Sequence, residues 1–368
     1  MQINSFLDLH THTRYPGSKF IKQEDIEQAA KNGGYSEILA MPNSSKIIDN
    51  LEVLEEARKL DSSLSIEVHR TASLTKGLAG QEPIDYKKLT EHGVFIFTDD
   101  GLSVVDDNLA ETIFRSIKEV GAAVFQHCEK SCHTMPGDIA PPNDNSHLKA
   151  IHISEETEIL NRDLKLVEKY GTRYHAQHLS TIESVELIRE AKINNLPVTA
   201  EVTPHHLLAN NENLDTSDGK YKMYPPIRTE NDRLAIIEAV NSNIIDVIAT
   251  DHAPHTNQEK HAGYFDAPAG IPLVQHALPA LFDLVDQGVL SNELVVDRAC
   301  HAPADLFGIE DRGYIREGYY ADLVLVDMKK PYQVNKENII YKCGWSPFEG
   351  HTFKTSIDTT IVNGTIVY

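Results

Sequence analysis

Short apolar runs alternate with longer amphipathic stretches along most of the chain. Runs of this length are typical of buried strands, and the amphipathic stretches have the spacing of helices. Several amphipathic stretches end in glycine, a common helix stop. The pattern predicts strands at residues 5–10, 36–42, 64–70, 93–100, 122–128, 172–180, 197–206 and 244–255, and helices at 24–34, 50–60, 85–93, 107–121, 155–171, 181–195 and 230–242.

Strands that alternate with helices indicate a parallel sheet with right-handed crossovers. Eight is the number of strands that closes a (β/α)₈ barrel. An open doubly wound sheet is the alternative, but it requires a glycine-rich turn after an early strand, and the sequence has none there. We therefore expect an α/β fold, a TIM barrel.

The pattern changes near residue 313. Residues 313–327 and 358–368 alternate apolar and polar positions, and the second stretch contains the turn Asn363-Gly364. We expect a barrel domain at 1–312 and a small accessory β element at 313–368, a reduced sandwich formed mainly by the C-terminal segment. The stretches 130–154 and 256–268 are predicted loops and candidate lids over a site.

Composition narrows the class of protein. The chain has 368 residues, 41% of them hydrophobic, which suffices for one large barrel. No apolar run approaches the roughly 18 residues that span a bilayer, and the first residues lack the pattern of a secretory signal, so we expect a cytoplasmic protein. The net charge of −21 disfavours nucleic acid and anionic lipid as partners. An anionic substrate would need a locally positive site, which metal ions could supply.

Histidine, rather than cysteine, points to chemistry. The four cysteines, which we expect to be incidental thiols, form no Cys-x-x-Cys pair: Cys128, Cys132, Cys300 and Cys343. His10 and His12 are two apart at the end of the first predicted strand, so they point to the same side. Barrel active sites lie at these strand ends, where two imidazoles can hold a metal. The alternative is a pair of structural polar residues.

Further polar residues end other strands. The fifth, sixth and eighth predicted strands end at His127, His178 and Asp251, and the barrel would place all three on one rim with His10 and His12. Such a set of nitrogen and oxygen ligands suits zinc, with manganese or cobalt also acceptable. Asp251 could also act as general base and then general acid. For His205 and His206 after the seventh strand, a supporting role is the expectation.

The fourth predicted strand ends in Asp99 and Asp100, and either carboxylate could join two metals about 3.5–4 Å apart that share an activated hydroxide. The alternative for Asp-Asp-Gly is a simple turn. Near the same rim, Arg14 could grip a substrate carboxylate, and Asn43 and His255 could share that task. For these three, an ordinary surface role is the alternative.

Together these segments resemble the dihydroorotase branch of the amidohydrolase superfamily. The matching stretches follow the family's order over nearly the whole chain: DLHTHTR, MPN, FTDDG, QHCE, HLST, EVTPHH, ATDHAPH, APAGIPLVQHALPAL, GYYADLVLVD and CGWSPFEG. The resemblance implies zinc-dependent, reversible interconversion of N-carbamoyl-L-aspartate and L-dihydroorotate, a step of pyrimidine biosynthesis. The expected partner is therefore a small-molecule substrate.

The resemblance also implies roles for single residues. Many relatives bridge their metals with a carboxylated lysine, which the fourth strand lacks; the family's other solution is an aspartate, which Asp100 matches. Two zinc ions per subunit would then be bridged by Asp100 and hydroxide. The implied ligands are His10, His12 and Asp251 for one ion, and His127 and His178 for the other. The implied substrate contacts are Arg14, Asn43 and His255 for a carboxylate, and the backbone of Ala269 and Gly270 for the pyrimidine ring.

The sequence departs from the family pattern in two places. Tyr224, in KMYPP, stands where the family has an asparagine that binds substrate, which bears on the choice of substrate. The chain also starts almost at the barrel, whereas many relatives have several strands first, so we expect the accessory sandwich to be reduced.

Two other functions compete with dihydroorotase. Hydantoinases and allantoinases are sister cyclic amidases, but they usually carry the lysine bridge. A non-catalytic scaffold that binds aspartate carbamoyltransferase would lose metal ligands, whereas all six are present here. A homodimer is the default assembly, because symmetric dimers are the commonest.

Overall fold

The protein is described here from a computed structural model that covers residues 1–130, 151–212, 214, 218–264 and 266–368. Cys132 and nearly all of the predicted loop 130–154 lie outside the described residues. Among the helices within these ranges, none has both the length and the apolar character that crossing a membrane requires.

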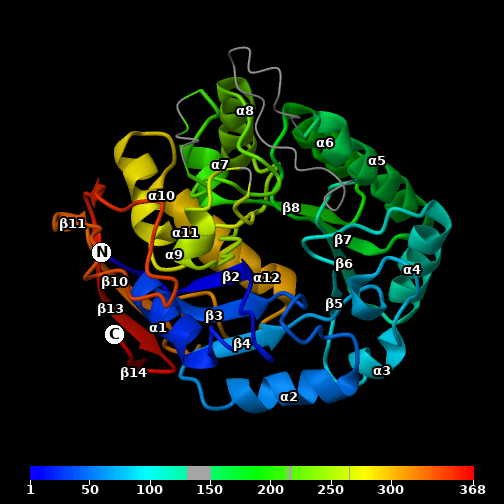
Figure 1. Ribbon diagram of the computed structural model, residues 1–368, viewed down its shortest axis with the longest axis horizontal. Helices are drawn as coiled ribbons and strands as arrows, with labels where there is room; N and C mark the ends of the chain where they lie inside the picture. Colours follow the sequence, from blue (N-terminus) through cyan, green and yellow to red (C-terminus); the bar gives the residue numbers. More distant parts are fainter. Residues whose placement is uncertain (131–150, 213, 215–217, 265) are drawn as a thin grey trace.

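A ring of parallel strands forms the centre of the molecule (Figure 1). They pair in the orders β2-β3-β4 and β5-β6-β7-β8-β9. Parallel bridges from Ala72 to Phe97 and from Thr11 to His252 join the two sheets at both seams, so the barrel predicted from the sequence is confirmed. In the described part of the chain its eight strands are β2 (Phe6–Thr11), β3 (Tyr35–Ala40), β4 (Glu67–Arg70), β5 (Ile96–Phe97), β6 (Ala123–Gln126), β7 (Arg173–Ala176), β8 (Val198–Val202) and β9 (Val247–Ile248).

Helices surround this ring, and their caps explain where they begin and end. Asn50 accepts a bond from the backbone of Val53 to start α2, and Gly34 and Gly171 end α1 and α5 in left-handed conformation. The helices that follow the strands are α1 (Gln23–Gly33), α2 (Leu51–Asp61), α3 (Tyr86–Thr90), α4 (Asp107–Glu119), α5 (Ile153–Tyr170), α6 (Ile182–Ile193), α7 (Pro204–Leu208) and α8 (Glu230–Asn241). Later come α9 (Asn257–Lys260), α10 (Ala277–Asp286), α11 (Asn292–Val296) and α12 (Ala302–Phe307).

Most predicted strands are longer than the observed ones, among them the fourth, sixth, seventh and eighth. The seventh was expected to run to residue 206, but β8 ends at Val202 and Pro204 opens α7. Proline has no N–H for a strand ladder, and its fixed φ suits the first turn of a helix. The eighth was expected to span 244–255, whereas β9 is only Val247–Ile248 and the chain then turns into the rim.

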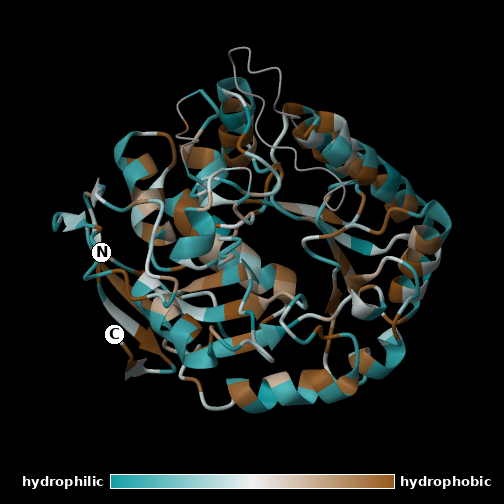
Figure 2. Ribbon diagram, in the orientation of Figure 1, coloured by the Kyte–Doolittle hydropathy of each residue, from teal (hydrophilic) through white to brown (hydrophobic). Residues whose placement is uncertain are grey.

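Apolar side chains fill the barrel and the layer between barrel and helices. Leu9, Leu39 and Phe125 lie inside the ring, and Leu306 and Phe307 of α12 pack against this cluster. The surrounding helices carry brown apolar positions interleaved with teal polar ones, as one-sided burial requires (Figure 2). A packed interior leaves the strand ends as the place for a site.

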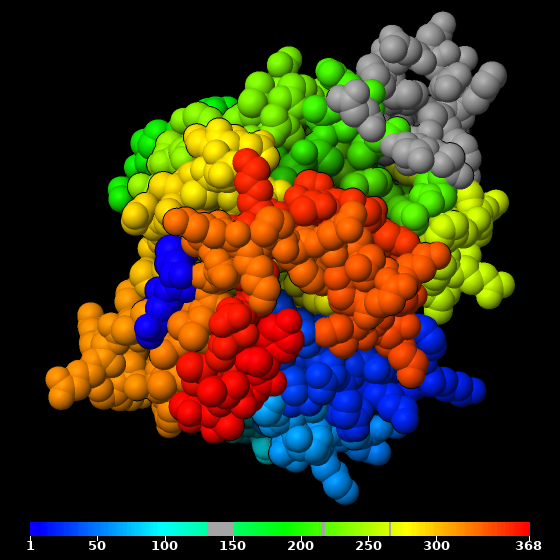
Figure 3. Space-filling view, turned by 90° about the vertical axis from the view of Figure 1, so that its left-hand side faces the viewer, coloured from blue at the N-terminus to red at the C-terminus, as the bar shows by residue number. Residues whose placement is uncertain are grey.

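An antiparallel sheet of order β1-β10-β13-β14 lies beside the barrel. It comprises β1 (Gln2–Asn4), β10 (Leu323–Asp327), β13 (Ser356–Val362) and β14 (Thr365–Ile366), and β11 (Tyr332–Gln333) pairs with β12 (Thr352–Phe353) nearby. The C-terminal segment, orange and red, covers this face next to the blue N-terminus (Figure 3). The sheet thus also takes in β1, and the division into 1–312 and 313–368 stays a prediction.

Candidate active site

A cavity of about 250 Å³ opens at the carboxyl ends of the barrel strands. One predicted ligand, His10, does not line this cavity and is completely buried beside it. Every other metal ligand and substrate contact that the resemblance implies lines the cavity, as do Tyr224, Gly101 and Ala253; these ligands and contacts are His12, Arg14, Asn43, Asp100, His127, His178, Asp251, His255, Ala269 and Gly270. The fold therefore brings the predicted set together, and the role of each residue stays a prediction.

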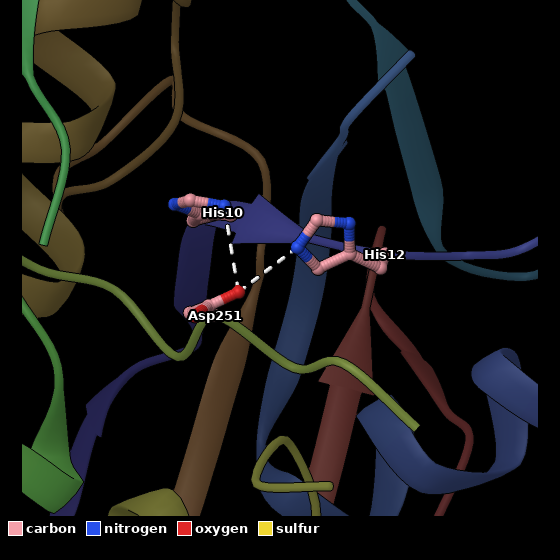
Figure 4. Close-up of side chains that lie close together, drawn as sticks. All are labelled: His10, His12 and Asp251. Atoms are coloured by element: carbon pink, nitrogen blue, oxygen red, sulfur yellow. Dashed lines mark hydrogen bonds and ion pairs between the residues drawn. The ribbon is translucent and has the colours of Figure 1, made fainter. Parts of the chain in front are cut away.

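Three of these side chains converge from the first and last barrel strands (Figure 4). Oδ1 of Asp251 lies 2.9 Å from Nε2 of His12 and 3.5 Å from Nε2 of His10. Their ligand atoms all lie within 4.8 Å of one another. The alternation of β2 points both imidazoles into the barrel mouth, as the two-residue spacing predicted.

A second group shares His10. Oδ1 of Asp100 lies 3.1 Å from Nε2 of His10 and 3.9 Å from Nε2 of His178, and Oδ2 lies 3.3 Å from Nε2 of His12. Nδ1 of His127 lies 2.9 Å from Nε2 of His178. Asp100 therefore lies close to three of the four predicted histidine ligands, namely His10, His12 and His178.

Three of the imidazole rings form a hydrogen bond through the nitrogen that faces away from the centre of the site. These bonds fix the orientation of each ring. Nδ1 of His10 donates to Glu201 at 2.5 Å, and Nδ1 of His12 donates to Asn43 at 2.8 Å. Nε2 of His127 donates to Glu129 at 3.0 Å. A neutral imidazole has one donor and one acceptor nitrogen, so in the neutral form that binds a metal each ring would present its acceptor to the centre of the site.

The donor set fits divalent metal ions. Nε2 of His10 and Oδ1 of Asp100 are buried without a hydrogen-bond partner, because their 3.1 Å contact is not aligned as a hydrogen bond. Unsatisfied buried polar atoms are rare in folded proteins and call for a reason. Imidazole nitrogens and carboxylate oxygens that converge in this way are the ligands that zinc prefers.

Charge coupling in the cluster is strong. Burial opposes protonation of His10, but the nearby carboxylates, Asp100 first, outweigh it and raise its pKa well above the ordinary value. Burial likewise opposes ionisation of Asp100, but His10 and His12 hold its pKa well below the usual range. Burial and the neighbouring imidazoles lower the pKa of His178 well below normal, so this ring is neutral and able to bind a metal.

Asp99 faces a different part of the molecule. Its carboxylate accepts bonds from the backbone amides of Leu74 at 2.7 Å and Thr75 at 3.0 Å, and from the Thr75 hydroxyl at 2.5 Å. Burial raises its pKa to about 6. Asp100, which the resemblance favoured over Asp99, is the aspartate beside the histidines.

Several of these residues have a positive φ angle, which sets the direction of their side chains. Arg14, His178 and Asp251 have positive φ angles of 63°, 31° and 46°. Such angles are strained for residues other than glycine and cluster at functional sites. Asp251 and His178 come just after β9 and β7, where the chain leaves the extended strand conformation and enters the loops of the rim.

Arg14 and His255 line the same cavity as the predicted ligands, and a guanidinium is a group that suits an anion. A terminal nitrogen of Arg14 lies 3.3 Å from Nε2 of His255, and Nε of Arg14 donates to the carbonyl of Pro254. Burial, with Arg14 next, lowers the pKa of His255 to about 3, so its ring is neutral. At Gly270, φ is 131° and an added Cβ would lie 2.6 Å from the carbonyl oxygen of Ala253, so this wall admits only glycine.

Glu201 and Glu129 were not identified from the sequence. Glu201 lies in β8, and its oxygens accept bonds from His10, from Nε2 of His175 at 3.1 Å and from the amide of His178 at 3.2 Å. A charged residue in the apolar run VTAEV was the available signal, since buried carboxylates are rare unless paired.

The histidine pair after β8 lies behind the site. Nδ1 of His206 bonds the Thr203 hydroxyl at 2.7 Å, and Nε2 donates to the carbonyl of Pro225 at 3.2 Å, next to Tyr224. His205 instead lines a separate cavity of about 260 Å³. The predicted supporting role therefore agrees with the position of His206 and not with that of His205.

Comparison with known proteins gives consistent matches. The profile described as "Amidohydrolase family" matches residues 3–367. A dihydroorotase of Anoxybacillus flavithermus is 36% identical over 373 residues, which cover 99% of this chain and 86% of the relative. A dihydroorotase of Bacillus cereus is 36% identical over 369 residues, covering 98% and 86%.

Solved structures agree at the level of fold. L-Hydantoinase (dihydropyrimidinase) from Arthrobacter aurescens superposes with a TM-score of 0.86 at 24% identity, covering 100% of this chain and 85% of that one. A D-hydantoinase gives 0.85 at 21% identity, with 100% and 84% covered. The solved structures confirm the barrel, and the family profile and the dihydroorotase relatives confirm the resemblance inferred from the motifs.

Proposed function

This chain belongs to the amidohydrolase family, and on that premise we propose that it is a dihydroorotase, interconverting N-carbamoyl-L-aspartate and L-dihydroorotate. It is a hydrolase of cyclic amides, as the family and the dihydroorotase relatives indicate. The choice of substrate within that class is the part that requires a test.

One observation carries the proposal. Ligand atoms of His10, His12 and Asp251 lie within 4.8 Å of one another, as do those of His10, Asp100 and His178, beside a cavity that the half-buried guanidinium of Arg14 also lines. A metal cluster that faces an anion-binding wall suits a ring that has an amide bond to cleave and a carboxylate to hold.

Two zinc ions are the cofactor we propose. His10, His12 and Asp251 would hold one and His127 and His178 the other, with Asp100 between them. Divalent ions in such a site supply Lewis acidity, which lowers the pKa of water toward neutrality and polarises a carbonyl group. The rings are already oriented for this by Glu201, Asn43 and Glu129.

Asp251 is the residue we assign to proton transfer. Its carboxylate faces the cavity, so it can accept a proton from the attacking water and return it to the amide nitrogen as the ring opens. Arg14 and His255 would hold the substrate carboxylate, with Asn43 beside them. The backbone at Ala269 and Gly270 can approach the ring closely, because Gly270 has no side chain.

Hydantoin or allantoin is the competing substrate class, and Tyr224 is the residue that supports this alternative. Tyr224 lines the cavity where the family places a substrate-binding asparagine. A phenol is larger than a carboxamide and has one hydroxyl instead of an amide group, so it changes both the room and the hydrogen bonds available to a ring.

The test is a direct assay. The purified protein would be analysed for bound metal and then incubated with dihydroorotate, N-carbamoyl-L-aspartate, hydantoin and allantoin. We expect bound zinc and turnover of the first two compounds. Turnover of hydantoin or allantoin alone would contradict the substrate, and absence of both metal and turnover would support a non-catalytic scaffold.

A further inference from the structure

Lys260 ends α9 at the rim of the barrel and is completely buried, with 0% of its surface exposed. Burial of an ammonium group is costly unless its donors are bonded. Nζ of Lys260 donates to the carbonyl oxygens of Lys222 at 3.1 Å, Pro268 at 2.8 Å and Gly270 at 2.9 Å. An ammonium has three donors, so these three carbonyls satisfy it.

The three carbonyls belong to two segments that form one wall of the active-site cavity. Lys222 lies two residues before Tyr224, and Pro268 and Gly270 flank Ala269, and all of Tyr224, Ala269 and Gly270 line the cavity. The amide of Gly270 also donates to the carbonyl of Lys222 at 2.9 Å. Lys260 therefore joins two segments that are distant in the sequence and adjacent in the wall.

Trp345 extends this connection to the anion-binding side. Its ring lies 5.6 Å from Nζ of Lys260, within range of a cation–π contact. Its Nε1 donates to the carbonyl of His255 at 2.8 Å. Trp345 is the only tryptophan of the chain and is itself buried, so its fluorescence reports on this cluster alone.

We propose that Lys260 is a positioning residue for the substrate, and that its ammonium sets the affinity of the cavity by holding the segments at Tyr224 and at 268–270 together. The inference rests on the proposed function, because it assumes that this wall contacts the cyclic amide. In this proposal the described part of the stretch 256–268, a candidate lid by sequence, is instead a fixed wall.

The test replaces Lys260 with methionine, which has similar length and no donor. Because the wall loses its anchor while the ligands and Asp251 are untouched, KM for dihydroorotate is expected to rise at least about tenfold, with kcat changed by less than about threefold and metal content unchanged. The control is Lys220→Met, in which a nearby lysine that pairs with Asp218 at 3.6 Å loses its charge; it should behave as wild type. Equal KM values for K260M and wild type would overturn the proposal.

Two measurements keep the proposal testable if K260M does not fold. In the wild-type protein, hydrogen exchange over residues 219–224 and 266–272 should be as slow as in the barrel strands; rapid exchange there would overturn it.

Lys260→Arg keeps the charge but is too long for the same three bonds, and it should give an intermediate KM and greater quenching of Trp345 by acrylamide. Wild-type protein that does not turn over dihydroorotate would contradict the proposed function. The exchange and quenching results would still show whether Lys260 holds the two wall segments together.

Discussion

Glu201 accepts a hydrogen bond of 2.5 Å from Nδ1 of His10, although 191 residues separate the two in the chain. The same carboxylate accepts from His175 and from the amide of His178. One group on β8 thus sets the orientation of one predicted ligand and the backbone of another. This role can be separated experimentally from the general stability of the barrel.

Glu201→Gln should weaken metal binding about 10–100-fold, because an amide is a weaker acceptor than a carboxylate for the His10 ring. The measurement is competition with a chromophoric chelator, together with the visible spectrum of the cobalt-loaded protein, which reports ligand geometry. Glu37→Gln is a matched control, since Glu37 is also a buried strand glutamate bonded to a histidine, His69 at 2.7 Å, outside the site. Unchanged affinity and spectrum in E201Q would refute the role.

Asp100→Ala and Asp99→Ala should behave differently despite their adjacency. Asp100 faces His10, His12 and His178, so its loss should reduce the metal content of the purified protein. Asp99 accepts two backbone amides and a hydroxyl, so its loss should lower the free energy of unfolding by about 1–3 kcal/mol and leave metal content near wild type. Metal analysis and urea unfolding of both variants decide the matter; the reverse pattern would assign the bridge to Asp99.

Asp251→Asn should lower kcat by about 10²–10⁴-fold, because the amide cannot accept and return a proton. The fold should persist, since asparagine has the same shape. Steady-state kinetics would be measured beside circular dichroism and metal content. A variant that keeps most of its activity would remove Asp251 from the mechanism.

Arg14→Met should raise KM for dihydroorotate about 10–100-fold, because the charge-assisted hydrogen bonds to the substrate carboxylate would be lost. The Arg14 side chain contacts His255 and the carbonyl of Pro254 rather than the predicted metal ligands, as far as the described residues show, so metal content should not change. An unchanged KM would mean that the carboxylate is held elsewhere.

His276 predicts a dependence of stability on pH. Burial among aromatic rings lowers its pKa from 6.5 to about 3. Between these values the unfolded chain binds a proton that the folded protein excludes, so His276 lowers stability as the pH falls below about 6.5, by at most about 1.4 kcal/mol per pH unit. Above that pH the ring is neutral in both states and has no such effect.

The check is urea unfolding of the metal-free wild type and His276→Phe from pH 5 to 8. Phenylalanine suits the aromatic surroundings and does not titrate. The free energy of unfolding of the His276→Phe variant should therefore fall less steeply as the pH is lowered, and the difference in slope should correspond to at most about one proton. Parallel curves for the two proteins would show that His276 does not contribute.

The sequence by itself determined the barrel and most of the candidate site. The eight-fold alternation of strand and helix needs only local patterns, and a side-chain period of two puts His10 and His12 on one side of a strand. Because parallel barrel strands all end at one rim, strand ends such as His127, His178 and Asp251 could be brought together without coordinates. The motifs that carry the resemblance are likewise local stretches of sequence.

Only the tertiary structure decided contacts between residues far apart in the chain. The resemblance favoured Asp100 over Asp99 as the bridge, but only the fold shows that the backbone amides of Leu74 and Thr75 hold the Asp99 carboxylate elsewhere. The place of β1 in the accessory sheet depends on pairing with β10 across more than 300 residues. The partners of Glu201 and Lys260 follow the same rule, since a buried charge is stabilised by whatever polar groups the fold brings within reach, and no local pattern specifies which these are.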